Sequence, residues 1–330
     1  MNIIIRPISI DDVLANDKIR YNTNNHWENN IRPENYDEII ANGHTNKWIN
    51  QFRSYKKIII NTKQDLYWMK LAYEIGSKTK RFPHSYDDEL EDMVAKYKHL
   101  DDIFDGSELS TDNSKHKKYI SNEKIFNGSE LSTDNSKHKK YISNEKIFNG
   151  SEYFIRTENV SLKEGIHGVG PYKDFKSIIQ SIITCRQGHS PLYEDTTEIT
   201  LYLCDFISNL NIKKEFRVFV CKNKITAISQ QSLYDVNHIL EPLSDKDKNE
   251  LIYKWIDIIK SYFESDIKQK ITHIDSYVMD FAILDDDTPY FIELNSFGKE
   301  YASGSALFGW IQDYNILYGL SDLIEFRYTC

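Results

Sequence analysis

The sequence predicts an α+β protein, in which sheets built mostly from neighbouring strands pack against separate helices. Strand-like apolar runs cluster in the second half of the chain, and several of them form hairpin-like pairs around a long amphipathic segment. Large apolar residues are also abundant, with 43 Ile, 22 Tyr and 16 Phe among 330 residues. This composition excludes a disordered chain and provides for a core that needs no disulfide or metal staples.

The first hundred residues predict a small α/β domain, which we place at residues 1–105. Short apolar runs at Ile3–Ile5 and Lys57–Ile60 are typical of buried strands. The apolar spacing of Asp65–Tyr73 and Tyr86–Tyr97 is typical of helices. This region carries no recognisable chemical motif.

A perfect tandem duplication follows. Gly106–Asn127 recurs letter for letter as Gly128–Asn149. Two identical copies are too few for a stacked repeat protein, which needs about three or more units. Each copy also has few large apolar residues. We therefore expect residues 106–149 to form a mobile, exposed insertion, whose lysine-rich clusters are more typical of a solvated surface than of a binding patch.

Residues 150–330 predict a second, larger α+β domain. Ser244 is placed to cap a long amphipathic helix that begins at Asp245. The expected elements are a strand at Tyr153–Thr157, a helix at Asp174–Thr184, a strand at Glu198–Phe206, a hairpin at Glu215–Gln230, a helix at Asp245–Phe263, strands at Tyr277–Leu284 and Pro289–Asn295, and a helical segment near Leu307–Leu323.

Charge and cysteine content limit the classes of function. Lys and Arg total 41 and Asp and Glu total 50, so the net charge of −9 provides no field that attracts nucleic acid. No apolar run reaches the length of a membrane span, and the first residues do not resemble a signal peptide. The four cysteines are scattered without zinc-site spacing, which is typical of reduced thiols. We expect a soluble, cytoplasmic protein that binds neither nucleic acid nor membrane.

The expected strands Tyr277–Leu284 and Pro289–Asn295 carry a candidate metal site. If their turn is centred between residues 286 and 287, Asp280 lies opposite Glu293, and Asn295 shares their face. Opposed like charges flanked by apolar residues are unfavourable unless a cation lies between them. Oxygen donors alone suit Mg²⁺ or Mn²⁺. The alternatives are a solvated hairpin face or a local salt bridge, and a turn of odd length would break this register.

A glycine-rich segment forms a candidate phosphate site. The strand that ends near Arg156 leads past Lys163 into three glycines, Gly165, Gly168 and Gly170. Glycines permit positive φ and close backbone approach, so successive N–H groups could surround an anion while the two cations add charge. The alternative is an ordinary flexible loop.

A charged strand supplies one more candidate. The alternation of Glu215–Val220 puts Arg217 on the face opposite to its apolar neighbours Phe216 and Val218. Arg217 could therefore reach the cleft of the carboxylate hairpin and bind phosphate in a bidentate manner. The alternative is an ion pair with Glu215.

Taken in order, the segments FIRTENVSLKEG, LYLCDFI, EFRVFVCKNKITAISQ, YVMDFAIL and FIELNSFG resemble the ATP-grasp superfamily, in which two α+β subdomains close on Mg–ATP. The resemblance spans about residues 153–310. Within the superfamily, EFRVFVCKNKITAISQ, ELNSFG and LFGW are most similar to the cell division cycle protein 123 family, whose members are assembly factors for translation initiation factor two. FIRTENVSLKEGIHG is also similar to a microbial ATP-grasp clade that carries arginine where lysine usually contacts phosphate.

The resemblance implies ATP and Mg²⁺ as cofactors and an ATP-grasp fold after the small N-terminal domain. It implies phosphate contacts and catalytic roles for Arg156 and Arg217, metal ligation by Asp280, Glu293 and Asn295, and an adenine-contacting hinge at Tyr202–Phe206 that includes Leu203 and Asp205. Lys163, Gly165 and Gly168 complete the expected nucleotide contacts.

Two functions follow from the resemblance. One is an ATP-dependent carboxylate–amine ligase that proceeds through an acyl phosphate, with a small molecule or protein of unknown identity as acceptor. The other is an ATP-binding assembly factor for a subunit of translation initiation factor two. An inactive ATP-grasp scaffold is a third possibility. The family usually has aspartate at the position of Glu293 and proline at the position of Ser296, and glutamate occurs at the metal position in other ATP-grasp proteins.

Overall fold

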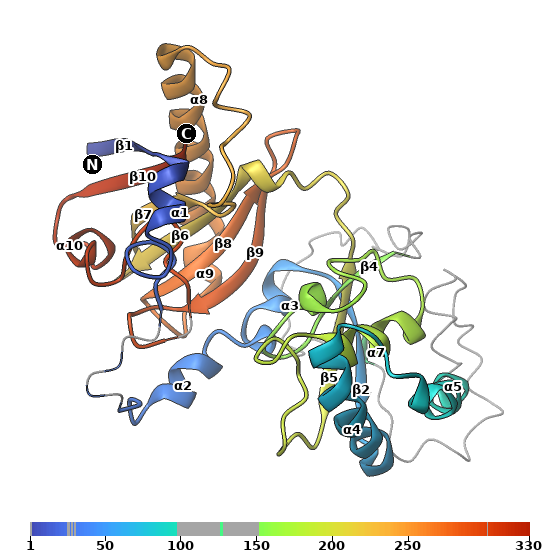
Figure 1. Ribbon diagram of the computed structural model, residues 1–330. Coiled ribbons are helices and arrows are strands. Elements are labelled where there is room, and N and C mark those ends of the chain that lie inside the picture. The colour runs from blue at the N-terminus through green and yellow to red at the C-terminus, as the bar shows by residue number, and fades with distance from the viewer. Residues whose placement is uncertain are drawn as a thin grey trace, which may run out of the picture. The chain divides into compact units, whose positions relative to one another are not determined.

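The computed structural model describes residues 2–24, 27, 29, 31–97, 126–127, 152–301 and 303–330. These residues form two compact units (Figure 1). Unit 1 comprises Met1–Phe52 and Ser208–Cys330, and unit 2 comprises Arg53–Ile207. The expected mobile insertion at residues 106–149 lies outside the described residues, apart from the backbone of Phe126–Asn127.

Unit 1 is built on a six-stranded mixed sheet with the order β1-β10-β7-β6-β8-β9. The first three strands in this order are parallel to one another, and the remaining neighbours are antiparallel. The strands are β1 (Asn2–Ile8), β6 (Glu215–Cys221), β7 (Lys224–Gln230), β8 (Tyr277–Ile283), β9 (Pro289–Ser296) and β10 (Leu323–Thr329).

One long helix accompanies this sheet. Helix α8 (Asp245–Tyr262) packs its buried Trp255 against Phe216 of β6, with ring centroids 5.4 Å apart. A π-helical segment, Phe263–Ile267, continues α8. The shorter helices of unit 1 are α1 (Ile10–Ala15), α2 (Tyr36–Ala41), α3 (Ile49–Phe52), α9 (Lys268–Lys270) and α10 (Tyr314–Leu317), with 3₁₀ turns at Thr45–Lys47 and Ile212–Lys214.

Unit 2 contains a four-stranded antiparallel sheet with the order β3-β2-β5-β4. One face of this sheet joins the helices in a core that includes Ile58, Ile155, Leu201 and Ile182. The strands are β2 (Tyr55–Ile60), β3 (Phe126–Asn127), β4 (Tyr153–Arg156) and β5 (Ile199–Asp205), and the helices are α4 (Lys63–Thr79), α5 (Asp87–Lys96) and α7 (Phe175–Thr184), with 3₁₀ turns at His84–Tyr86 and Leu162–Glu164.

The α+β class is confirmed, and both expected hairpins form. The Ser244 cap is present, because its Oγ accepts a hydrogen bond from the Asp247 N–H at 3.3 Å. Among the described residues, no helix combines the length and apolar character that crossing a membrane requires.

The expected helical segment near Leu307–Leu323 is wrong. Only Tyr314–Leu317 is α-helical, and Leu323–Thr329 is the strand β10. β10 lies between β1 and β7, and its polar residues are buried together with its apolar ones. Neither the helical period nor the alternation of a half-buried strand marks such a segment clearly.

The two units also divide the chain differently from the expected domains at 1–105 and 150–330. β1 pairs in parallel along its whole length with β10, which joins the N-terminus to unit 1. β2 pairs with β5, which joins the following segment to unit 2. Pairing between strands so far apart in the chain leaves no local signature in the sequence.

Candidate functional site

The carboxylate hairpin brings Asp280 and Glu293 together. Asp280 on β8 lies directly opposite Glu293 on β9, as expected. The assumed turn is wrong, however, because Ile283 pairs with Pro289 and leaves a loop of odd length between them. A β-bulge that leaves Ile292 without a partner restores the register, so the two carboxylates still face each other.

Arg217 occupies the other side of Asp280. The two residues are directly opposed on β6 and β8, and the guanidinium holds both carboxylate oxygens, with Nε 2.8 Å from Oδ1 and Nη2 2.7 Å from Oδ2. Asp280 is 2% exposed. Arg217 therefore pairs with Asp280 rather than with Glu215, and it reaches the carboxylate hairpin as expected.

Burial and charge act on this cluster in opposite directions. Burial, together with the nearby Glu293 carboxylate, raises the pKa of Asp280 above its usual range, although Arg217 lowers it. Burial lowers the pKa of Arg217, but the stronger combined effect of its acidic neighbours, first of all Asp280, leaves that pKa raised. Burial is thus the main cause of the raised pKa of Asp280, and the neighbouring carboxylates are the cause of the raised pKa of Arg217.

The donor set of this cluster fits a hard divalent cation. Asn295 donates its Nδ2 to Asp280 Oδ2 at 3.4 Å, so its amide group lies beside this carboxylate. Asp280 Oδ1 accepts from Arg217 Nε and retains a lone pair for a cation, whereas Oδ2 accepts from both Arg217 Nη2 and Asn295 Nδ2. Two carboxylates and an amide oxygen suit Mg²⁺ or Mn²⁺. Over the described part of the chain, no group of three or more His, Cys, Asp or Glu side chains is arranged to hold a metal ion.

Arg217 and the two carboxylates belong to a polar row that crosses all six strands of the unit 1 sheet. Each member of the row lies directly opposite the next, so the side chains share one face of the sheet. The polar row consists of Arg6, Arg327, Ser229, Arg217, Asp280 and Glu293, on β1, β10, β7, β6, β8 and β9 respectively. The sequence did not indicate Arg6, Ser229 or Arg327: only the strand order reveals that Arg6 and Arg327 continue this row, whereas Ser229 lies opposite Arg217 in the expected β6–β7 hairpin.

A second group of candidates lies in unit 2. Arg156 on β4 is buried and lies opposite Tyr202 on β5, which in turn lies opposite Lys57 on β2. The Lys57 Nζ is 5.9 Å from the centroid of the Tyr202 ring, and the Tyr202 hydroxyl donates to Glu158 at 2.8 Å. One sheet face of unit 2 therefore carries two cations beside an aromatic ring. No motif in the sequence marks Lys57 as a site residue.

The glycine-rich loop does not form the expected anion nest. Five of the six N–H groups from Gly165 to Gly170 donate hydrogen bonds within the protein. Two of them, those of Ile166 and His167, reach Thr184 Oγ1 and Ser181 Oγ of α7. A nest requires successive N–H groups that are free to surround an anion.

Gly165 has a packing role instead. A Cβ at this position would lie 2.6 Å from both the Cβ and the carbonyl oxygen of Ser181. The glycine therefore lets the loop approach α7 closely. Gly168 has a φ of +60°, which favours glycine, and open space around it.

The remaining predicted residues of unit 2 differ in their surroundings. Leu203 is fully buried in the hydrophobic core, and its backbone pairs with strands on both sides. Asp205 ends β5 just before the chain leaves unit 2 at Ile207, and burial raises its pKa although Lys56 lowers it. Lys163 is exposed in the 3₁₀ turn before the glycines. The expected role of Leu203 in contacting adenine is thus not available to its side chain here.

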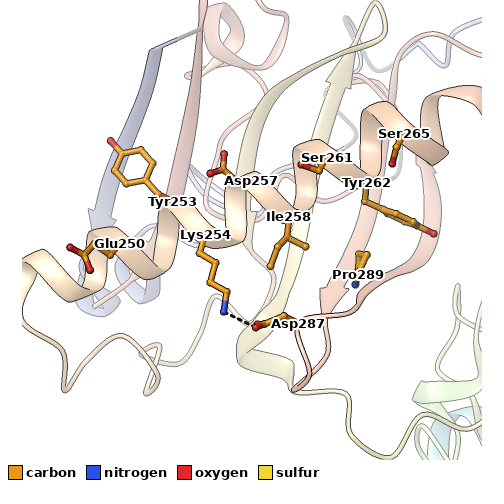
Figure 2. A pocket seen from close by; sticks show the side chains of 10 residues that line it. All are labelled: Glu250, Tyr253, Lys254, Asp257, Ile258, Ser261, Tyr262, Ser265, Asp287 and Pro289. Carbon is orange, nitrogen blue, oxygen red and sulfur yellow. Dashed lines mark hydrogen bonds and ion pairs between the residues drawn. The ribbon is translucent and has the colours of Figure 1, made fainter.

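A separate hollow lies along α8 in unit 1. Its volume is about 790 Å³, and its walls are the outer face of α8 and the β8–β9 turn. Figure 2 shows Lys254 of α8 reaching Asp287 of the turn, at an Nζ–Oδ2 distance of 2.6 Å. None of the predicted site residues lines this hollow. The carboxylate cluster and the hollow are therefore different features of the unit.

Comparison with known proteins supports the resemblance seen in the sequence. The D123 family model matches residues 173–328. No curated protein matches the chain in a sequence search. Among solved structures, Cdc123 from Schizosaccharomyces pombe is similar with a TM-score of 0.50 and 12% identity, covering 88% of this chain and 97% of that chain.

Two further structures are less similar. C-terminally truncated Cdc123 from S. pombe has a TM-score of 0.39 and 13% identity, covering 53% of this chain and 72% of that chain. A RiPP-associated ATP-grasp ligase from Chryseobacterium gregarium, in complex with ADP and a leader and core peptide, has a TM-score of 0.20 and 16% identity, covering 45% of this chain and 39% of that chain. The resemblance to the cell division cycle protein 123 family is confirmed by the D123 match, and the α+β fold by the likeness to Cdc123 from S. pombe.

Proposed function

We propose that the protein binds ATP together with Mg²⁺, with Asp280, Glu293 and Asn295 as oxygen donors to the cation. The observation that carries this proposal is the directly opposed pair of Asp280 and Glu293 beside Asn295. Like charges held opposite each other at a buried position are unfavourable unless a cation compensates for them. A bound Mg²⁺ supplies positive charge to the phosphate oxygens of the nucleotide.

Unit 2, taken by itself, carries a second candidate for phosphate binding. Arg156 and Lys57 flank Tyr202 on one face of the sheet, where guanidinium and ammonium groups suit phosphate and the ring suits a base. Lys163, Gly165, Gly168 and Asp205 stay predictions as nucleotide contacts. The hydrogen bonds of the glycine loop favour Arg156 and Lys57 over the loop backbone as the phosphate-binding groups.

Isothermal titration of ATP with Mg²⁺ and with EDTA tests the proposal. Glu293→Gln is the diagnostic variant, since Glu293 is only half-buried and the change keeps its shape. Asp285→Asn is the matched control, because Asp285 lies in the same hairpin and pairs with Lys214 on the surface. We expect Glu293→Gln to lose Mg²⁺-dependent ATP binding and Asp285→Asn to retain it. Equal binding by both variants contradicts the proposed cation site.

Two uses of the nucleotide remain to be distinguished. A carboxylate–amine ligase needs groups that stabilise charge at a transferring phosphoryl group, and Arg156 and Arg217 were predicted for this role. Arg217 is held by both oxygens of Asp280 and by a backbone carbonyl, which favours a fixed structural arginine over one that follows a phosphoryl group. This observation, with the D123 family match, favours the second use, an assembly factor for a subunit of translation initiation factor two.

Turnover separates the two uses. For the assembly factor, we expect tight ATP binding with little ADP release, and co-purification of a translation initiation factor two subunit from a cell extract of the source. For the ligase, ADP release rises on addition of a carboxylate or amine acceptor. Rapid acceptor-dependent ADP release without a protein partner contradicts the assembly-factor proposal.

A further inference from the structure

The polar row contains a second buried arginine that the proposed function does not use. Arg327 of β10 is 4% exposed. Its Nη1 and Nη2 hold the two carboxylate oxygens of Asp313 at 2.8 and 2.6 Å, and its Nε holds Glu325 Oε1 at 2.7 Å. Arg6 contributes a second bond to Glu325 from β1, at 2.8 Å.

Arg327 binds a loop that lies over the polar row. We call residues 304–313 the bracket loop; it contains the LFGW motif, Leu307–Trp310. Arg327 Nη1 donates to the Leu307 carbonyl at 2.9 Å, and its guanidinium carbon lies 4.0 Å from the centroid of the Phe308 ring. Asp313 closes the loop by accepting from the Gly309 N–H at 2.9 Å. Arg327 thus contacts the Leu307 carbonyl, the Phe308 ring and Asp313, which is the last residue of the bracket loop.

The bracket loop in turn holds Arg217. The Gly304 carbonyl accepts from Arg217 Nη1 at 2.6 Å, and the Leu307 N–H donates to Ser229 Oγ at 3.0 Å. Three members of the polar row, Arg327, Ser229 and Arg217, therefore bind the backbone of one short loop. The guanidinium of Arg217 is fixed on one side by Asp280 and on the other by this loop.

We propose that Arg327 and Asp313 are positioning residues that hold the bracket loop so that its Gly304 carbonyl orients Arg217 against Asp280. The inference rests on the proposed Mg²⁺–ATP site, since it assigns a role in keeping the cation-binding carboxylate in place. Outer partners of this kind commonly determine how well a metal ligand is oriented. Stability alone does not account for the pair, because buried ion pairs contribute little net stability relative to apolar residues of similar volume.

Binding of ATP with Mg²⁺ to the full chain provides the first test. Asp313→Asn removes the charge of the clamp and keeps its shape. We expect it to weaken Mg²⁺–ATP binding by about 10-fold to 100-fold, as loss of an outer partner does. The matched control is Arg6→Ala, which removes an ion pair of the same network from the edge strand β1. Unchanged affinity in a folded Asp313→Asn protein overturns the proposal.

A double-mutant cycle distinguishes positioning from a general structural role. Arg217→Lys keeps the charge but loses the two-point contact with Asp280. If Asp313 acts through Arg217, the double variant binds Mg²⁺–ATP no more weakly than Arg217→Lys alone. If the two losses multiply, Asp313 acts independently and the proposal fails. Ser229→Ala, which removes another anchor of the bracket loop without a change of charge, is the second variant if Asp313→Asn does not fold.

A measurement without nucleotide separates this inference from the proposed function. Hydrogen exchange of the Arg217 Nε–H, followed by NMR and assigned by its absence in Arg217→Lys, reports how firmly Asp280 and the bracket loop hold the side chain. We expect slow exchange in the unmodified protein and in Arg6→Ala, and faster exchange in Asp313→Asn. Failure of the unmodified protein to bind Mg²⁺–ATP contradicts the proposed function, whereas equal exchange in all three proteins contradicts the positioning role.

Discussion

Arg217 and Asp280 form a two-point salt bridge between directly opposed positions of adjacent strands, with Glu293 on the far side of the same carboxylate. The arginine is thus a neighbour of the carboxylate pair and partly neutralises it. Glu293 adds a second negative charge beside Asp280, and a divalent cation bound there would compensate for it. The cluster is therefore held by a buried salt bridge and also carries the oxygen donors that a hard cation prefers.

Breaking the buried salt bridge between Arg217 and Asp280 should cost far more stability than breaking the exposed bridge of Asp285 on the same hairpin. Asp280→Ala leaves Arg217 buried without its partner, and we expect a loss of about 3–5 kcal/mol in the free energy of unfolding. Relief of repulsion from Glu293 offsets at most about 1 kcal/mol of this. Urea unfolding followed by circular dichroism measures the change.

The matched control is Asp285→Ala, which breaks the bridge between Asp285 and Lys214 at 3.2 Å. Asp285 has a 63% exposed side chain, so we expect a loss of no more than about 1 kcal/mol. Similar losses in the two variants contradict the buried, paired geometry of Asp280.

Gly165 should matter for folding rather than for anion binding. A Cβ at Gly165 would lie 2.6 Å from the backbone carbonyl oxygen of Ser181, which is fully buried in α7. We expect Gly165→Ala to lower the free energy of unfolding by about 1–3 kcal/mol through overpacking, in the absence of any ligand. Thermal unfolding measures this. An unchanged melting temperature combined with weaker nucleotide binding favours the anion nest instead.

In the carboxylate hairpin, the sequence predicts the facing pair correctly, although one premise of that prediction is wrong. The alternation of both strands correctly placed Asp280 and Glu293 face to face. The premise of a symmetric turn was wrong, and the bulge at Ile292 compensates for the odd loop. A bulge has no strong local signature in a strand of mixed residues, so its presence could not be read from the chain.

Residues that depend on strand order could not be predicted. Arg327 joins the polar row only because β10 lies between β1 and β7, and nothing near Arg327 in the chain indicates that neighbour. Lys57 meets Tyr202 for the same reason, across strands separated by most of unit 2. Periodicity defines the faces of an element, whereas the contacts between distant elements arise from the whole fold.

Alkaline conditions should destabilise unit 2. Burial raises the pKa of the Cys185 thiol from its ordinary value of 9.0 to about 12, and burial raises the pKa of the Tyr172 hydroxyl from 10.0 to about 12. Both groups stay protonated when folded and ionise at lower pH when unfolded. Their stabilising contribution is complete below pH 9 and is lost as the pH rises to about 12.

The pH dependence of the urea midpoint between pH 8 and about 11 checks this expectation. Cys185→Ala should make the decline shallower above pH 9, because one ionisation disappears from the unfolded state. Cys330→Ala is the control, since Cys330 is exposed. A midpoint that declines equally steeply in all three proteins argues against a thiol contribution.

Replacing Glu293 by glutamine should separate stability from cation binding. Glu293 lies opposite the buried Asp280, and its charge raises the pKa of that carboxyl after burial does. Glu293→Gln removes the repulsion and keeps the shape. In EDTA we expect the variant to be more stable than the unmodified protein by about 0.2–1 kcal/mol, the usual cost of opposed like charges in a sheet.

The same substitution should abolish the stabilisation that Mg²⁺ with ATP gives to the unmodified protein, because a ligand raises the melting temperature only if it binds the native state. Melting curves in EDTA and in Mg²⁺–ATP therefore cross: the variant melts higher without the ligand and lower with it. If the carboxylate pair has only a structural role, the variant melts higher than the unmodified protein in EDTA but does not melt lower in Mg²⁺–ATP. A variant that is less stable in EDTA shows instead that Glu293 makes a net favourable contact with Asp280 or Arg217, and the argument for a cation at this position then loses its electrostatic basis.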